Sequence, residues 1–299
     1  MGNKKYILIT SAYNEEKNIE KTIQSVIVQS ILPAEWIIVS DGSTDKTNKI
    51  IQSYQKKYKF INFIRMPAGN THSFASKVFA LQAGFESLKN KYYDFIGILD
   101  ADVSFEKNYF KEIITRFEND ENLGVAGGNI IEYSNGVYMK RIKTLNSVAG
   151  AVQLFRKECF DDTIGFQPFE YGGEDAVVEI SARMKGWAVK TFPEIEVIHH
   201  GFVGGKNLLR TRYRRGIRFF LLGYHPVFNI VRCIFRMRER PILIGSFVEL
   251  IGFFYAYMKY KKSKLPVEVV CYLRNEQIQR LKHLLKFYHF SNIKDQISY

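Results

Sequence analysis

Phe95–Asp102, which reads Phe-Ile-Gly-Ile-Leu-Asp-Ala-Asp, joins a short apolar run to two acidic residues. A run of five nearly all-apolar residues is typical of a strand that is buried on both faces of a sheet. Asp100 and Asp102 then fall at the carboxyl end of that strand, where open α/β sheets bind their ligands. Because hard divalent cations prefer oxygen ligands, the triplet Asp100-Ala101-Asp102 is a candidate metal site. The alternative is that Asp102 only caps the next helix.

Strand-like runs alternate with helical patterns on both sides of this stretch. The first half therefore predicts a parallel sheet covered by helices, an α/β fold. The second half is mixed, so the whole sheet is expected to be mixed but mostly parallel. The predicted strands are 6–10, 36–39, 60–66, 95–99, 125–133, 150–155, 188–192 and 196–200, and the predicted helices are 45–58, 74–88, 105–117, 174–185 and one that Asn14 caps.

The composition is that of a globular protein, with 46% hydrophobic residues among 299 and a formal net charge of +13. This charge favours polyanions such as nucleic acid, anionic lipid headgroups or phosphorylated substrates. The three cysteines are far apart in the chain, without a Cys-x-x-Cys pair, which disfavours a zinc site and fits a reducing compartment. Residues 1–5 are polar and lead into a strand, so no signal peptide is expected.

The last third differs from the rest of the chain. Apolar and aromatic residues dominate 217–235 and 242–258, and basic clusters lie on both sides of the second run. The second run has about the length of a marginal membrane span, but Glu249 in its middle makes insertion costly. We therefore expect C-terminal amphipathic or hydrophobic helices on an anionic membrane surface, at its cytoplasmic face, in a peripheral or re-entrant arrangement. The alternative is a helical cap over the sheet, and basic residues among long aliphatic runs disfavour a nucleic-acid partner.

Two more polar stretches follow the first two predicted strands. Ser11–Glu16 follows the first, and its Tyr13 is placed to stack on a nucleobase. Ser40–Asp45 follows the second, and its Asp41 is placed to accept a hydrogen bond from a base or a ribose. Both stretches are also compatible with ordinary strand-to-helix turns, in which these polar residues cap helices.

Taken with Gly172-Gly173-Glu174-Asp175, these stretches resemble the motifs of the family-2 glycosyltransferases, in the family's order and over about residues 5–205. Two positions depart from the family pattern: Ser11 stands where proline is usual and Ser40 where a first aspartate is usual. The resemblance implies a GT-A fold, which is a Rossmann-like nucleotide-binding domain, over residues 1–205. Residues 206–299 would then form a basic, helical, membrane-associated region.

The resemblance also assigns roles to residues. Asp175 is the expected general base, with Glu174 as the alternative, because an acceptor hydroxyl must lose its proton as it attacks. Asp102 is the expected ligand of Mg²⁺ or Mn²⁺, and His200 is favoured over His199 to complete that site, unless the two histidines form a surface pair. The expected nucleotide-sugar contacts are Ser11, Tyr13, Glu15, Asp41, Lys77, Asp100, Ala101 and Arg212.

Two of these contacts have equally plausible alternatives. Lys77 lies in a helix that resembles the family's Lys-x-x-Ala-Leu-Asn-x-Gly pattern, and it either faces the diphosphate or is a solvated helix lysine. Arg212 either pairs with the diphosphate or belongs to a basic membrane-surface segment. Leu209 and Tyr213 replace the glutamine and tryptophan that processive members carry here, so the resemblance implies a non-processive enzyme.

The resemblance therefore implies an inverting, metal-dependent glycosyltransferase. It would move a sugar, from a UDP-sugar in preference to other nucleotide-diphosphate sugars, to a saccharide or lipid-linked acceptor in surface polysaccharide or glycolipid biosynthesis. The alternative is a non-catalytic, nucleotide-sugar-binding membrane adaptor with the same fold. A nicotinamide dehydrogenase is disfavoured because the first strand lacks a Gly-x-Gly-x-x-Gly turn.

Overall fold

The structure, a computed structural model, describes residues 4–67, 74–88, 91–134, 137–140, 145–201, 207–239 and 241–296. The chain divides into two compact units, Met1–Val203 and Gly204–Tyr299. The functional division into a nucleotide-binding domain of residues 1–205 and a membrane-associated region of residues 206–299 stays a prediction.

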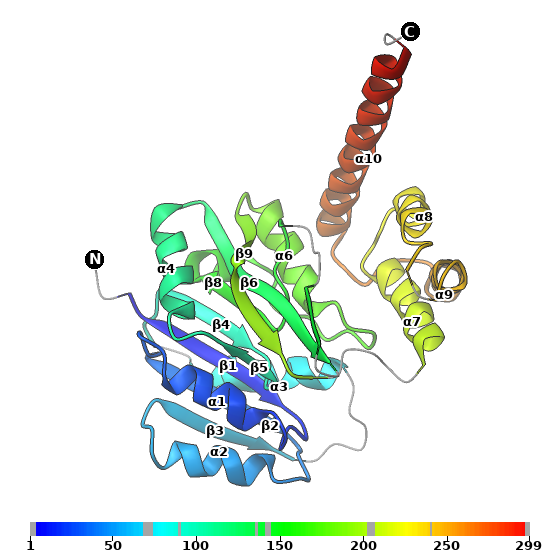
Figure 1. The fold of residues 1–299 in the computed structure, drawn as a ribbon. Coiled ribbons are helices and arrows are strands. Elements are labelled where there is room, and N and C mark those ends of the chain that lie inside the picture. Colours follow the sequence, from blue (N-terminus) through cyan, green and yellow to red (C-terminus); the bar gives the residue numbers. More distant parts are fainter. Residues whose placement is uncertain are drawn as a thin grey trace. The chain divides into compact units, whose positions relative to one another are not determined.

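The first unit contains one mixed sheet, which has nine strands among the described residues (Figure 1). Their order is β3-β2-β1-β4-β8-β6-β9-β5, and β7 pairs with β6. Neighbours from β3 to β4 are parallel, whereas the pairings of β8 with β4 and β6, of β5 with β9 and of β7 with β6 are antiparallel. The sheet is thus mixed as predicted, but only its first half is parallel throughout. The strands are β1 Tyr6–Ala12, β2 Glu35–Asp41, β3 Ile61–Met66, β4 Phe95–Leu99, β5 Val103–Phe105, β6 Leu123–Ser134, β7 Val137–Lys140, β8 Val152–Arg156 and β9 Ala188–His199.

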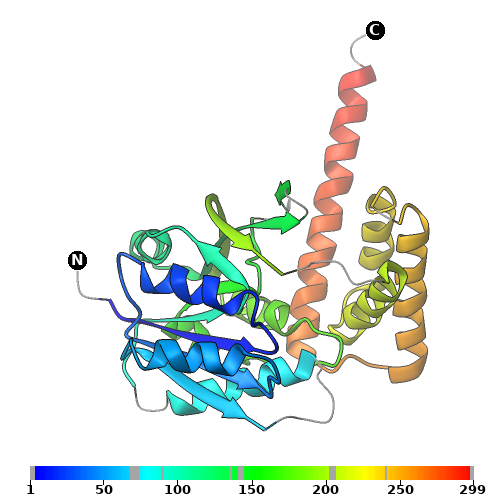
Figure 2. The ribbon, with the colours of Figure 1, turned by 60° about the horizontal axis from the view of Figure 1, so that its bottom comes forward.

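Helices cover both faces of this sheet (Figures 1 and 2). One hydrophobic cluster joins residues of α1, α2 and α4 to one face, and a second joins residues of α3, α5 and α6 to the other. Two covered faces explain why the central strands are apolar without alternation. The helices of this unit are α1 Ile19–Ile27, α2 Thr47–Gln55, α3 Phe74–Ser87, α4 Tyr109–Asn119, α5 Lys157–Asp162 and α6 Glu174–Met184.

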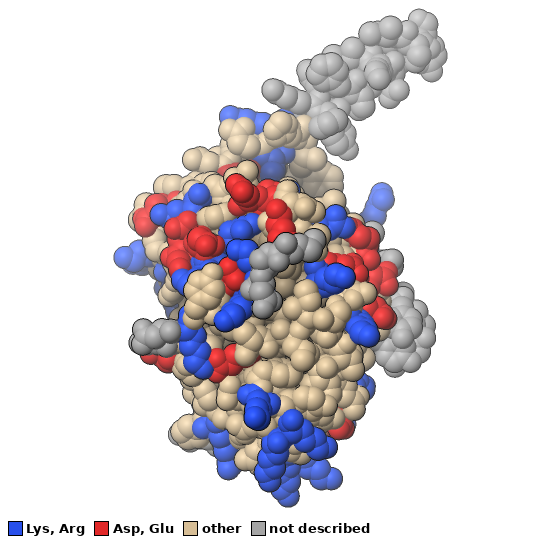
Figure 3. All heavy atoms as spheres, turned by 90° about the vertical axis from the view of Figure 1, so that its left-hand side faces the viewer, with Lys and Arg blue, Asp and Glu red and all other residues tan. Residues whose placement is uncertain are grey.

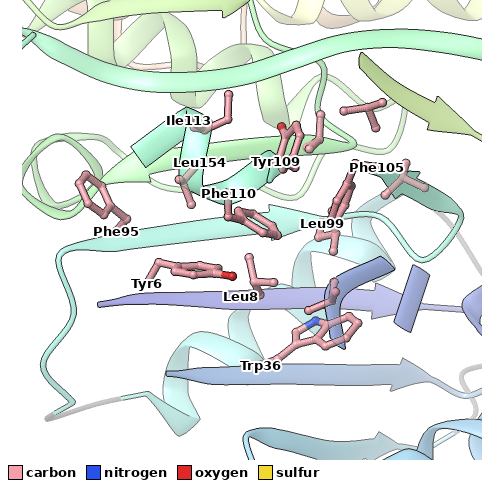
Figure 4. Packing of buried hydrophobic residues seen from close by; sticks show 14 of the residues in the cluster. Tyr6, Leu8, Trp36, Phe95, Leu99, Phe105, Tyr109, Phe110, Ile113 and Leu154 are labelled. Atoms are coloured by element: carbon pink, nitrogen blue, oxygen red, sulfur yellow. The ribbon is translucent and has the colours of Figure 1, made fainter. Parts of the chain in front are cut away.

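Large side chains fill the first cluster (Figure 4). Tyr6 and Leu8 point into it from β1, while the intervening Ile7 belongs to the second cluster, as the alternation of a strand requires. Trp36 of β2 is fully buried, and its indole N–H donates a hydrogen bond of 3.0 Å to the hydroxyl of Thr10. This packing fixes the strands whose carboxyl ends carry the candidate site.

Two predicted helix caps are wrong. Helix α1 begins at Ile19, so Asn14 does not cap it. Asp102 caps no helix either, because the short strand β5 follows it and α4 begins only at Tyr109. A three-residue strand has no periodicity to detect, which is why the sequence predicted a helix from residue 105.

The second unit is helical among its described residues. Its helices are α7 Leu208–Leu221, α8 Pro226–Phe235, α9 Ile244–Tyr260 and α10 Val267–Gln296. Glycines let α7 and α9 approach closely, because a Cβ on Gly216 would lie 2.0 Å from the Glu249 carbonyl oxygen and one on Gly252 would lie 2.1 Å from that of Tyr213. None of the helices described here is both long and apolar enough to cross a membrane.

Surface charge varies along the molecule (Figure 3). Acidic and basic side chains are intermixed over the upper part of the face shown. Basic side chains gather at its lower end, at the height of α2 and β3 in Figure 1. Lys46, Lys49, Lys56, Lys57 and Lys59, in and beside α2, are all exposed.

Candidate active site

The three polar stretches predicted as a site meet at one edge of the sheet. β1 lies between β2 and β4 and is parallel to both, with Ala12 opposite Ser40 and Ile9 opposite Ile98. Parallel neighbours end at the same edge, so the stretches that begin after Ala12, at Asp41 and at Asp100 adjoin one another. Tyr13 is 38% exposed there. This arrangement leaves an aromatic ring and several carboxylates at the edge where α/β proteins bind nucleotides.

Hydrogen bonds lock the first two stretches together. Asn14 has a φ of +54°, its backbone N–H donates to the Ser43 hydroxyl, and its side-chain oxygen accepts from the Thr44 N–H at 2.8 Å. The Glu15 N–H donates to the Thr47 hydroxyl at 2.8 Å. The role of Asn14 is therefore to hold the loop after β1 against the loop after β2.

Asp100, Asp102 and His199 form the one group among the described residues whose ligand atoms could hold a metal ion. One ligand atom from each lies within 4.8 Å of the other two, and the Nε2 of His199 lies 3.5 Å from a carboxylate oxygen of Asp102. A Cβ at Gly201 would lie 2.0 Å from the other oxygen of Asp102, so glycine leaves that side of the carboxylate open. Two carboxylates and an imidazole are chemically suited to a divalent cation.

His199, and not the favoured His200, joins this group. β5 pairs with β9 so that Val103 lies opposite His199, and adjacent residues of a strand point to opposite faces. The Nε2 of His200 instead lies 2.7 Å from the Ser104 hydroxyl, and burial lowers the pKa of His200. The sequence indicated that only one of the two histidines could face Asp102, but the choice depends on the pairing of β9 with β5.

Acidic groups crowd this edge of the sheet. Burial, followed by the charge of Asp100, raises the pKa of Asp102. Burial, with Asp102 as the next cause, raises the pKa of Glu15 to about 7. Carboxylates that are brought together away from water raise one another's pKa unless a cation compensates them. The local charge is thus strongly negative.

Lys77 of α3 supplies a positive charge beside Asp100. Its ammonium lies 2.6 Å from a carboxylate oxygen of Asp100. Burial lowers the pKa of Lys77, but the charges of Asp100 and Glu174 outweigh burial and hold that pKa above its ordinary value. Lys77 is therefore an ion-paired residue rather than a solvated helix lysine, and its charge also interacts with those of the acids that begin α6.

Glu174 and Asp175 begin α6 directly after Gly173, which has a φ of +105°. Glu174 is only 7% exposed, and burial together with the adjacent Asp175 raises its pKa. Asp175 is partly exposed and packs against Gly150, where a Cβ would lie 2.5 Å from its Oδ2. Of the two acids, Asp175 is thus the more accessible to an incoming group.

Glu179 is a site-supporting residue that the sequence did not reveal. It lies one turn after Asp175 on α6, is 3% exposed, and accepts hydrogen bonds from the Val148 N–H, the Ser147 hydroxyl and the Gln153 amide at 2.7, 2.8 and 3.0 Å. In the same segment, the Ala151 carbonyl accepts from the Asp100 N–H at 2.9 Å. Glu179 thereby holds the segment 147–153, which contacts Asp100 through Ala151 and Asp175 through Gly150. In the sequence, only the i+4 spacing of Glu179 from Asp175 could have indicated this role.

Arg212, the remaining predicted contact, lies in the second unit. Its guanidinium is 3.0 Å from a carboxylate oxygen of Glu239 and 3.8 Å from one of Glu249. These pairs occupy Arg212 inside its own unit, and its contact with a diphosphate stays a prediction.

The sequence of the first unit matches a family of glycosyltransferases. The model of the family described as "Glycosyl transferase family 2" matches residues 7–172, more than half of the chain. The chain therefore belongs to glycosyl transferase family 2, and the predicted GT-A family is confirmed.

Curated relatives are polysaccharide synthases by name. The chain is 25% identical over 271 residues to the poly-beta-1,6-N-acetyl-D-glucosamine synthase of Staphylococcus aureus (strain COL), with 84% of this chain and 62% of that protein covered. It is 23% identical over 286 residues to the synthase of the same name from Staphylococcus epidermidis, with 89% and 63% covered. The chain thus spans less than two thirds of the length of these relatives.

Solved structures share the fold at low identity. The mannosyltransferase PcManGT from Pyrobaculum calidifontis, in complex with GDP-Man and Mn²⁺, has a TM-score of 0.55 and 15% identity, with 93% of this chain and 80% of that chain covered. S. aureus TarS 1–349, in complex with UDP-GlcNAc, has a TM-score of 0.53 and 14% identity, with 90% and 78% covered. At these identities the likeness concerns the fold alone.

Proposed function

We propose that the protein transfers a sugar from a nucleotide-diphosphate sugar to an acceptor hydroxyl with inversion at the anomeric carbon. The observation that carries this proposal is the ion pair of Lys77 with Asp100, because the charge of Lys77 also interacts with those of Glu174 and Asp175. The edge proposed to bind the nucleotide and the two acids proposed as general base would therefore form one site. A single displacement needs no covalent intermediate on the enzyme.

Metal dependence is supported by the charge of the site. Glu15, Asp100, Asp102, Glu174 and Asp175 interact with one another, and such a cluster would repel a nucleotide diphosphate. Asp102 would hold Mg²⁺ or Mn²⁺, with His199 in place of the predicted His200 and Asp100 nearby. The ion would supply compensation for the negative charge that develops on the departing diphosphate.

Asp175 is our choice for the general base. Its carboxylate is partly exposed at the start of α6, whereas Glu174 is buried beneath it and has a raised pKa. A base must contact the acceptor hydroxyl, so accessibility favours Asp175. The charges of Glu174 and Lys77 would then influence the pKa of the proposed base.

The donor would lie along the carboxyl ends of β1, β2 and β4. Tyr13 would stack on the base, Asp41 would accept a hydrogen bond from base or ribose, and uracil is favoured by the family resemblance. A UDP-sugar and a GDP-sugar each accompany one of the structures that share the fold. The full set of proposed donor contacts is Ser11, Tyr13, Glu15, Asp41, Lys77, Asp100, Ala101 and Arg212.

The proposed acceptor is a saccharide or a lipid-linked saccharide at the cytoplasmic face of an anionic membrane. The names of the curated relatives support a place in surface polysaccharide synthesis. Leu209 and Tyr213 favour a single addition over processive synthesis.

The test is nucleotide release from a panel of nucleotide sugars, with and without Mn²⁺, for the full chain and two variants. Asp175→Asn should abolish transfer while calorimetry still detects donor binding, and Glu174→Gln should keep measurable transfer. Full transfer by Asp175→Asn contradicts the base assignment, and loss only in Glu174→Gln moves the role to Glu174. Donor binding with no turnover by the unmodified chain, with any sugar or acceptor tried, favours the non-catalytic adaptor.

A further inference from the structure

The outer side of α9 is apolar and exposed. Phe247, Ile251, Phe254 and Met258 recur every three or four residues, which places them on one side of the helix, and they are 66%, 46%, 44% and 72% exposed. Large apolar side chains scattered singly over a surface are ordinary, but a contiguous stripe indicates an interaction site.

The turn that leads into α9 extends this stripe. Ile242 and Leu243 are each 60% exposed. Leu243 has a φ of +60° and a ψ of −57°, a sparsely populated conformation that costs roughly 1–3 kcal/mol, and its N–H donates to the Met237 carbonyl at 2.8 Å. The turn thus holds a leucine outward in a strained backbone conformation. We call these two residues, with Phe247, Ile251, Phe254 and Met258, the α9 apolar surface.

The one acidic residue of α9 lies on the opposite side of the helix from this surface. Glu249 is 1% exposed, and its carboxylate contacts the guanidinium groups of Arg215 of α7 and Arg232 of α8. These arginines, with burial opposed to them, hold the pKa of Glu249 below its ordinary value. The residue that made a membrane span costly in the sequence is therefore neutralised inside the helical unit, and the outer side of α9 carries no acidic residue.

The charge around this surface is almost entirely positive. Residues 207–264 contain thirteen Lys and Arg against only two acidic residues, Glu239 and Glu249. Both acids are paired with arginines. Arg238 before α9, and Lys259, Lys261 and Lys262 at its end, are exposed. Basic side chains at both ends of an apolar stripe match the headgroup and acyl layers of an anionic bilayer.

We propose that the α9 apolar surface inserts into the interface of an anionic lipid bilayer, with α9 parallel to the membrane plane and the flanking lysines and arginines at the headgroups. A second copy of the chain is a poorer occupant, because two such basic surfaces would repel each other. Nucleic acid would leave the apolar side chains exposed to water. The inference specifies the membrane contact of the proposed function, but it is tested without sugar transfer, so either proposal can fail alone.

The experiment is co-sedimentation of the full chain with vesicles. Vesicles of phosphatidylcholine mixed with phosphatidylglycerol should bind the chain more tightly than phosphatidylcholine alone, and added salt should weaken that difference. Phe247→Ser/Phe254→Ser should lower partitioning by about ten-fold or more, because each ring leaves the lipid. The matched control, Val28→Ser/Leu32→Ser, alters two exposed apolar residues of the first unit and should bind as the unmodified chain does.

Thermal unfolding of both variants should match that of the unmodified chain, since all four positions are exposed. Unchanged binding of Phe247→Ser/Phe254→Ser, or no binding of the unmodified chain to anionic vesicles, overturns the proposal. If the same variant instead converts a dimer to a monomer without lipid, and vesicle binding is absent, the surface is a contact between copies and the proposal is wrong.

Discussion

Glu179→Gln tests whether the fold keeps a buried carboxylate at an energetic cost. Burial, with Asp175 as the next cause, raises the pKa of Glu179 from an ordinary value of 4.5 to about 7. Folding therefore favours its protonated form. The stability linked to this group is fully present below about pH 4.5 and is lost as the pH rises towards 7.

The magnitude follows from the two pKa values. A difference between 4.5 and about 7, at 1.36 kcal/mol per pH unit, corresponds to about 3 kcal/mol above pH 7. Glutamine carries no charge, its oxygen can accept from the Val148 N–H and the Gln153 amide, and its nitrogen can donate to the Ser147 hydroxyl. The stability of Glu179→Gln relative to the unmodified chain should thus rise by about 3 kcal/mol between pH 4.5 and pH 8.

Urea unfolding followed by tryptophan fluorescence measures this change in the free energy of unfolding for the first unit, which contains Glu179. The protein has two tryptophans, Trp36 and Trp187, and both lie in the first unit, so the signal reports on the unit that contains Glu179. Glu118→Gln on the exposed side of α4 is the matched control, and its relative stability should not vary over the same pH range. If the Glu179→Gln difference is equally flat, the hydrogen bonds fully compensate the buried charge and the reasoning is refuted.

Three further changes probe the site. His199→Ala should weaken Mn²⁺ binding measured by calorimetry by about ten-fold or more, whereas His200→Ala should leave it nearly unchanged; the reverse order would restore the sequence-based choice. Lys77→Met should destabilise the fold by about 2 kcal/mol, because it leaves the carboxylate of Asp100 without its ion-pair partner, and unchanged stability in urea unfolding would contradict this. Asn14→Ala should cost about 2 kcal/mol in urea unfolding and Asn14→Gly about 1, because glycine tolerates the positive φ, and equal losses would show that strain there is negligible.

The sequence predicted the parallel half of the sheet because β1, β2 and β4 are apolar on both faces and therefore stand out from the helices. The same pattern placed Tyr13, Asp41 and Asp100 at one edge, since parallel strands end together. The other half, in which β6 pairs parallel with β9 but antiparallel with β7 and β8, could not be predicted in this way. β5 has three residues, and β9 is one strand where the composition indicated two. Which histidine faces Asp102 depends on how those two strands pair.

Contacts between segments that are distant in the chain also could not be predicted from the sequence. Glu179 and Glu249 look alike in the sequence, each an acidic residue amid an apolar stretch. In the structure the two carboxyl groups have opposite environments. Glu179 accepts its hydrogen bonds from a backbone N–H and two neutral side chains, with one arginine, Arg183, at 3.8 Å, and burial raises its pKa. Glu249 contacts arginines from two helices, and its pKa falls. The hydrogen-bond donors to Glu179 lie 26 to 32 residues away in the chain, and the arginines that bind Glu249 lie 17 to 34 residues away. A local sequence pattern therefore cannot distinguish the two environments.

The net charge of +13 thus conceals two opposite environments. The edge that is proposed to bind a diphosphate is acidic, and Lys77 supplies a counter-charge there through its ion pair with Asp100. The excess of positive charge is concentrated in 207–264, where Arg212, Arg215 and Arg232 form ion pairs with Glu239 and Glu249. An acidic nucleotide site requires a cation to hold an anionic donor, and a basic apolar surface requires an anionic partner of its own. The proposed metal-assisted transferase at an anionic membrane would satisfy both requirements, and neither requirement follows from the summed charge of the chain.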